Sequence, residues 1–130
     1  MRLIPDRLVG EEVRHVKYVL MFIETEQFEK DLAAMGADER DRAIAKVGRW
    51  LAEHQGRITN RGAKLQPAHT ATTVRLDRAA EPLVTDGPYV EGKEVISGFL
   101  EVDVADLDEA IAMVRSWPGC PVVEIRPVEG

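Results

Sequence analysis

Two segments of this chain, residues 16–23 and 95–104, have apolar side chains on both of their alternating faces. The first alternates Tyr18, Leu20 and Phe22 with Val19, Met21 and Ile23. The second is expected to carry Ile96, Gly98, Leu100, Val102 and Val104 on one face, with Val95 and Phe99 on the other. A strand that is apolar on both faces lies in the middle of a sheet that is covered on two sides. These patterns predict that the two segments are the central strands of one sheet.

Two other segments have the apolar spacing of amphipathic helices. Asp38 is the expected N-cap of the first helix. Asp106 is the expected N-cap of the second, with Glu109 three residues later as the partner in a capping box. A polar stretch at residues 27–35 is expected to be helical as well. The two apolar stripes are Ile44, Val47 and Leu51 in the first helix and Leu107, Ala110, Ile111, Val114 and Trp117 in the second.

The remaining stretches have strand-like composition. Residues 57–65 and 122–128 are expected to form single strands, and residues 72–76 are expected to pair with residues 83–85 across a turn. The order is then strand, helix, strand with a hairpin, strand, helix, strand. This is the split βαβ, or ferredoxin-like, arrangement of an α+β protein, in which an antiparallel sheet carries two helices on one face.

Two helices cover only one face of such a sheet, which leaves Phe99 and the second apolar face of residues 16–23 without a cover. Soluble monomers rarely expose apolar patches of this kind. The simplest cover is a second copy of the chain packed sheet against sheet, and two-fold dimers are the commonest homo-oligomers. We therefore expect a homodimer.

The composition is that of an ordinary globular domain. The 130 residues fit one domain, which we place at residues 16–130 after an N-terminal extension at residues 1–15. A net charge of -6 without a basic stripe argues against a nucleic-acid partner. The N-terminus lacks the apolar core of a signal peptide, no stretch is long and apolar enough to span a membrane, and the single Cys120 forms no internal disulfide. A cytoplasmic protein without a membrane partner is expected.

The tripeptide Asp86-Gly87-Pro88 places a short carboxylate at a sharp reversal of the chain, because Gly permits positive φ and Pro fixes φ. Two roles are open for Asp86. It can face a cleft, where it would act as a general base or orient a substrate hydroxyl or ammonium group. It can equally accept backbone N–H groups and hold its own turn.

Other candidate residues surround this motif in the sequence. His69 is either an exposed loop residue or a proton-transfer partner of Asp86, and Arg75 is expected to point towards a cleft or a dimer interface. Lys93 either binds an anionic substrate group or pairs on the surface. The three histidines are widely spaced and have no Cys or carboxylate cluster, so no metal site is expected, and no phosphate-binding loop or other cofactor motif is present.

Several stretches of the chain resemble the YCII-related family, in particular the branch named for its Asp-Gly-Pro-Phe motif. They are residues 17–21, 71–75, 84–94, 98–99, 103–110 and 123–127. The resemblance implies a ferredoxin-like subunit that dimerises into an α+β barrel, with a cleft lined by sheet and motif residues. It implies little about activity, although some relatives are encoded beside, or fused to, extracytoplasmic-function sigma factors.

The chain departs from the family pattern at two points. Tyr89 stands where the motif has Phe, which adds a hydroxyl that could bind a ligand or reach water. Some relatives also carry a His near the start of the long first helix, proposed to act with an Asp as a catalytic dyad. Residues 37–42 contain no His, so that dyad cannot be transferred to this chain.

These observations leave two hypotheses of different classes. The first is a homodimer that binds a small molecule, in which Asp86 and His69 flank a pocket shared with Tyr89 and Arg75 and Lys93 contacts the substrate. Its reaction would be a cofactor-independent proton transfer, as in an isomerase or a lyase. The second is a non-catalytic regulatory or interaction module that acts with a transcription factor.

Overall fold

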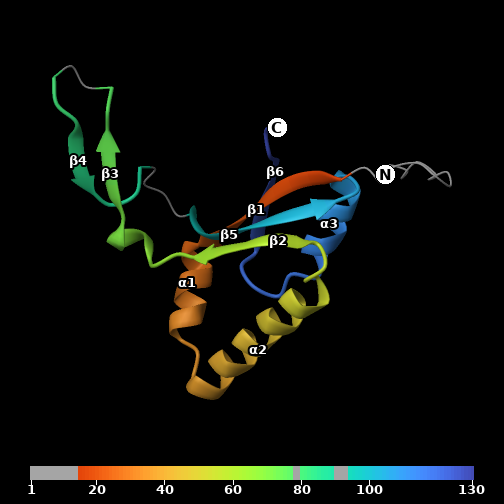
Figure 1. Ribbon diagram of the computed structural model, residues 1–130. Coiled ribbons are helices and arrows are strands. Elements are labelled where there is room, and N and C mark those ends of the chain that lie inside the picture. Colours follow the sequence, from red (N-terminus) through yellow and green to blue (C-terminus); the bar gives the residue numbers. More distant parts are fainter. Residues whose placement is uncertain (1–14, 78–79, 90–93) are drawn as a thin grey trace.

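The computed structural model describes residues 15–77, 80–89 and 94–130 (Figure 1). A short 3₁₀ turn at Ala68–Thr70 precedes the hairpin. In chain order the elements are β1 (Val16–Thr25), α1 (Glu26–Ala33), α2 (Ala37–Glu53), β2 (Ile58–Lys64), β3 (Thr72–Arg75), β4 (Leu83–Asp86), β5 (Glu94–Val104), α3 (Leu107–Arg115) and β6 (Val122–Pro127).

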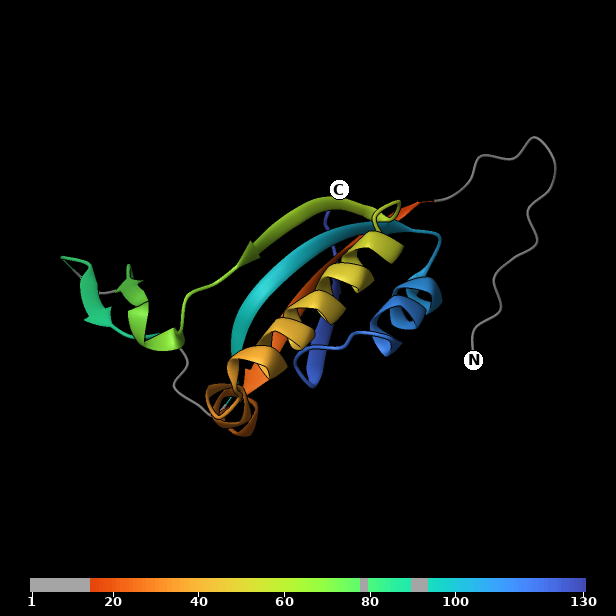
Figure 2. The same cartoon turned by 90° about the horizontal axis from the view of Figure 1, so that it is seen from below.

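The main sheet has the strand order β2-β5-β1-β6, and all of its neighbouring strands run antiparallel. The two strands that are apolar on both faces, β1 and β5, are therefore central, as predicted. Helices α2 and α3 lie on the same face of this sheet (Figure 2). This arrangement confirms the α+β, ferredoxin-like fold, and α1 adds a short helix between β1 and α2.

A β-bulge in β5 overturns part of the predicted face pattern. Gly98 pairs with Phe22 while Ile96 pairs with the next residue, Ile23, so Ser97 is an extra residue in β5. An extra residue reverses the alternation of faces on either side of it. Ile96 therefore does not share a face with Gly98 and Leu100, contrary to the expectation. The hydroxyl of Ser97 donates a 3.2 Å hydrogen bond to the carbonyl of Phe22, which satisfies this buried side chain.

The helix starts follow local capping chemistry. In α3 the carboxylate of Asp106 accepts a 2.9 Å hydrogen bond from the backbone N–H of Glu109, which confirms Asp106 as the N-cap. The Glu109 carboxylate accepts a 3.2 Å bond from the N–H of Ala105, one residue before the N–H that a capping box uses. The expected cap of α2 is wrong. That helix begins at Ala37, one residue before Asp38, after a Gly36 that offers no side chain to bond.

The core lies between the main sheet and the helices. Its buried side chains are Tyr18, Leu20, Phe22, Trp50, Leu100, Val102, Val104, Ala110, Met113 and Cys120. Trp50 attaches α2 to α3, because its indole N–H lies 3.0 Å from the Met113 carbonyl and 3.1 Å from the Ser116 hydroxyl. The ring of Trp117, just beyond α3, stacks on Phe22 at 4.4 Å between centroids.

The opposite face of the sheet carries the second apolar set of β1. Met21 pairs with Phe99 across the strands, and Phe99 is 39% exposed. No described helix lies over this face. The dimer remains a prediction that would account for this face.

The predicted hairpin is a separate two-stranded sheet of β3 and β4, paired from Thr72 and Asp86 to Arg75 and Leu83. It stands away from the main sheet and the helices in two perpendicular views (Figures 1 and 2).

Candidate functional site

The Asp86-Gly87-Pro88 motif lies at the base of the hairpin. Gly87 has a φ of 101, a left-handed conformation that residues with a Cβ rarely adopt. Its N–H donates a 2.7 Å hydrogen bond to the carbonyl of Ala71, and its carbonyl accepts a 2.7 Å bond from the hydroxyl of Thr73. The reversal is thus held by the backbone of Gly87 and by a side chain from the opposite strand.

The carboxylate of Asp86 does not hold this turn. Its side chain is exposed, and among the described residues it accepts no hydrogen bond and forms no ion pair. Within the described part of the chain, the turn-holding role is filled by Thr73 instead. None of the residues that the structure describes occupies the Asp86 carboxylate.

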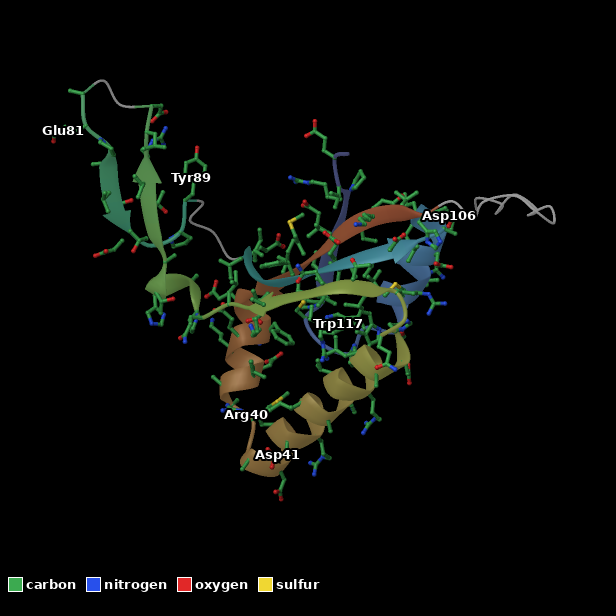
Figure 3. All side chains as sticks on the ribbon, in the orientation of Figure 1. Arg40, Asp41, Glu81, Tyr89, Asp106 and Trp117 are labelled. Carbon is green, nitrogen blue, oxygen red and sulfur yellow. The ribbon has the colours of Figure 1, made fainter. Side chains whose placement is uncertain are left out.

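Arg75, the last residue of β3, and Tyr89, just after β4, are brought together. Figure 3 labels Tyr89 beside the hairpin. The guanidinium carbon lies 5.6 Å from the centroid of the Tyr89 ring, within range of a cation–π contact. The same guanidinium makes a bidentate bond to Asp77, at 3.2 Å from Nε to Oδ1 and 2.8 Å from Nη2 to Oδ2. This hydrogen bond lowers the pKa of Asp77, and it raises the pKa of Arg75 together with a smaller contribution from Tyr89.

The hairpin does not bring Asp86 and Arg75 to one face. Asp86 pairs with Thr72, and Arg75 pairs with Leu83, three positions further along the ladder. Residues that pair across two strands share a face, and successive pairs alternate. Asp86 therefore shares its face with Val74 and Val84, whereas Arg75 lies on the other.

His69 is exposed and lies in the 3₁₀ turn at Ala68–Thr70, three residues before the pairing partner of Asp86. It is thus at the same end of the hairpin as Asp86. Lys93, the remaining predicted substrate contact, lies outside the described residues.

A groove that the sequence did not predict lies between the helices and the main sheet. Its volume is about 440 Å³, and its walls are mostly apolar side chains of α1, α2 and β1. An adjoining groove of about 500 Å³ continues to Pro67 and Ala68 at the base of the hairpin. Glu24 and Lys64 line both, and the Lys64 ammonium lies 2.8 Å from the Glu24 carboxylate.

The YCII-related domain family matches residues 16–129. The chain belongs to the YCII-related family. It is also 40% identical over 70 residues to an uncharacterized protein of Rhizobium meliloti (strain 1021). That alignment covers 51% of this chain and 56% of the relative, so this YCII-related chain spans about half the length of the protein that it matches.

One sequence signal could have located the groove of this YCII-related domain. In β1, Tyr18, Leu20 and Phe22 face the helices, and the alternation places Glu24 next on the same face. A carboxylate on the same strand face as three buried apolar residues indicates either the edge of a cavity that is open to water or a buried partner for its charge. Lys64 could not be paired with Glu24 from the sequence, because its register depends on irregular pairing of β2 with β5.

Among the described residues, no three His, Cys, Asp or Glu side chains lie close enough to hold a metal ion.

Burial, followed by the positive charge of Arg57, lowers the pKa of His54, whose ring lies 4.8 Å from the ring of Trp50. No helix in the described ranges has the length and apolar character needed to cross a membrane.

Proposed function

We propose that this YCII-related protein is a homodimer that binds a small molecule beside the Asp86-Gly87-Pro88 motif and transfers a proton on it without a cofactor. The observation that carries this proposal is the Asp86 carboxylate, which is exposed and accepts no hydrogen bond within the described residues. A carboxylate that only held the turn would accept backbone N–H groups. Here Gly87 and Thr73 hold it, and no described residue donates to either carboxylate oxygen of Asp86.

Asp86 would accept a proton from a carbon acid or a hydroxyl of the substrate, and His69 would return a proton to a second atom, as in an isomerisation. His69 is the candidate because it lies at the same end of the hairpin. Tyr89, Arg75 and Lys93 would bind the substrate. Arg75 faces away from Asp86 within one hairpin, so in this scheme the second copy contributes part of the site.

The dimer is supported by two uncovered apolar regions. One is the sheet face with Phe99, and the other is the hairpin, where Val84 is 60% exposed. An isolated two-stranded hairpin is marginally stable in water. A second copy packed against both regions would remove these apolar side chains from water and exclude water from Asp86.

The experiment combines assembly with proton transfer. Sedimentation of the full chain at micromolar concentration should report a dimer, and Phe99→Glu should shift it to a monomer. Exchange of the α-proton of small carbonyl compounds in D₂O, followed by NMR, should be catalysed by the unmodified chain. Asp86→Asn should reduce the exchange rate about 100-fold or more, the scale of one lost general base.

Glu81→Gln is the matched control, because it removes a carboxylate from the same hairpin without touching the motif. It should retain exchange, and circular dichroism should show all variants folded. A monomeric unmodified chain would contradict the dimer. A folded Asp86→Asn variant that exchanges as fast as the unmodified chain would contradict the catalytic role.

A regulatory module without catalysis, linked to sigma-factor control of transcription, is the second candidate. The observation that favours it is the exposed apolar surface of the hairpin, where Leu76 and Val84 are both open to solvent. Such a surface also fits the docking of a different protein. In that case Val84→Asp would abolish binding to the sigma factor, while no carbonyl compound would show catalysed exchange.

A further inference from the structure

The long helix α2 is held to the rest of the molecule at one end. Trp50, near its C-terminus, is buried and hydrogen-bonded to Met113 and Ser116. Ile44, which lies earlier in α2 on the apolar stripe with Val47 and Leu51, is 64% exposed. Helices α1 and α2 form a V below the sheet in the view of Figure 1, and the two helices meet at residues 34–36. The apolar stripe of α2 lies along the wall of the groove and is only partly covered by other side chains.

This groove has the size and lining of a small-molecule site. Its volume of about 440 Å³ is within the range of ligand pockets, about 300–1,000 Å³. Its walls come from three directions, with Phe28 and Leu32 from α1, Val47 and Leu51 from α2, and Phe22 and Leu100 from the sheet. An apolar ligand would cover the half-exposed stripe that α2 leaves open.

One charged pair lies where the main groove meets the adjoining one. The Glu24 side chain is 12% exposed, and it holds the Lys64 ammonium at 2.8 Å. The ammonium also lies 3.4 Å from the carbonyl of Ser97. A lysine has three N–H donors, so a third remains for another acceptor. The Lys64 side chain is 69% exposed, so this residue places a cation at the solvent-facing mouth of an apolar cavity.

The charge around the two grooves favours an anion. Three cations, Arg40, Arg61 and Lys64, line them together with two carboxylates, Glu24 and Glu29. The local balance is positive in a chain whose net charge is -6. A cationic ligand would meet more like charges than opposite charges at this site.

We propose that the groove between α1, α2 and the main sheet binds an amphipathic monocarboxylate, with its apolar body along the α2 stripe and its carboxylate on Lys64. This site is distinct from the Asp86 motif, and none of its lining residues belongs to the hairpin strands. Most of its lining residues lie on the helix side of the sheet, and Phe99 is the lining residue that it shares with the face expected to contact a second copy.

The test is calorimetric titration of the full chain with three probes of equal chain length, octanoate, 1-octanol and octylamine. Octanoate should bind roughly tenfold more tightly than 1-octanol, because a charge-assisted hydrogen bond is added, and octylamine should bind most weakly. Lys64→Gln should reduce the affinity for octanoate roughly tenfold and leave that for 1-octanol unchanged. Ile44→Glu, at an exposed position of the α2 stripe, should weaken both probes without unfolding the chain.

Two further variants separate an anchoring role of Lys64 from a structural one. Glu24→Gln should strengthen octanoate binding, because it removes a neighbouring negative charge, whereas a purely structural pair would lose binding with either partner. Lys46→Gln removes the same charge from α2 outside the groove and should change nothing. Equal affinities for octanoate and 1-octanol, or no binding of either at millimolar concentration by a chain that circular dichroism shows to be folded, would overturn the proposal.

Discussion

The main sheet and the β3–β4 hairpin are built from similar apolar residues, yet they bury them very differently. Leu20 and Val102 in the main sheet are 0% exposed, whereas every residue of β4 is exposed. Both regions have paired strands, so strand pairing alone does not decide burial. What differs is the cover, because the helices pack on the main sheet and no described element packs on the hairpin.

The comparison separates the region whose contacts stabilise the fold from the region whose side chains are exposed to solvent. The main sheet with α2 and α3 contains the contacts that hold the fold, such as the Trp50 bonds and the Phe22–Trp117 stack. The hairpin contains the motif with the exposed carboxylate. Substitutions in the first region should change the free energy of unfolding. Those in the second should change association and binding.

The largest difference is expected from a matched pair of truncations. Leu20→Ala should lower the free energy of unfolding by about 2–5 kcal/mol, because it leaves a cavity in a closed core. Val84→Ala in the hairpin should change the monomer's unfolding free energy by less than about 0.5 kcal/mol. Urea denaturation at protein concentrations below dimerisation measures both. Similar losses at the two positions would mean that the hairpin is covered within one chain.

A smaller effect tests the helix that closes the main sheet. Asp106→Ala should cost about 1 kcal/mol, because the N-cap bond to Glu109 is lost. Asp38→Ala in α2 should cost less, about 0.3–0.5 kcal/mol, since Asp38 lies in the first turn but makes no cap bond. Thermal unfolding of the two variants compares them directly. An equal cost for the two variants would show that the N-cap bond of Asp106 stabilises the protein no more than the helix dipole does.

The smallest effect is a dependence of stability on pH that arises from His54, at the end of α2, and not from a residue of the hairpin. The pKa of His54 is lowered from 6.5 in the folded chain, so the unfolded chain binds more protons just below that pH. Stability should therefore be full above pH 6.5 and fall as the pH is lowered towards the folded pKa of His54. His54→Phe should flatten this part of the profile, measured by urea titration in steps of pH. An unchanged profile would show that His54 protonates equally in both states.

Much of the fold could be predicted from the sequence because its signals are local. The two-sided apolar pattern placed β1 and β5 at the centre of the sheet, and the Asp106 N-cap placed the start of α3. The bulge at Ser97 was missed, because an unbroken alternation from Ile96 to Val104 is also consistent with a regular strand. The start of α2 was missed for a similar reason, since Asp38 is a good cap residue that happens to lie inside the helix.

The candidate site was less predictable, because it depends on distant contacts. The groove depends on how α2 is attached. Trp50 bonds to Met113, 63 residues away in the chain, whereas Ile44 of the same helix is exposed to solvent. No local pattern reveals such an angle between a helix and a sheet. The hairpin residues Asp86 and Arg75 were grouped from the motif, and their opposite faces became evident only with the pairing register.

Strand β2, one of the two outer strands of the main sheet, carries register shifts on both sides of Asn60. At Gly62 its φ is 55, and a side chain there would collide with the carbonyl oxygen of Phe99. A strand so irregular cannot offer an evenly spaced row of N–H and C=O groups to another chain. At this border of the main sheet, edge-to-edge joining with a neighbouring molecule is therefore disfavoured.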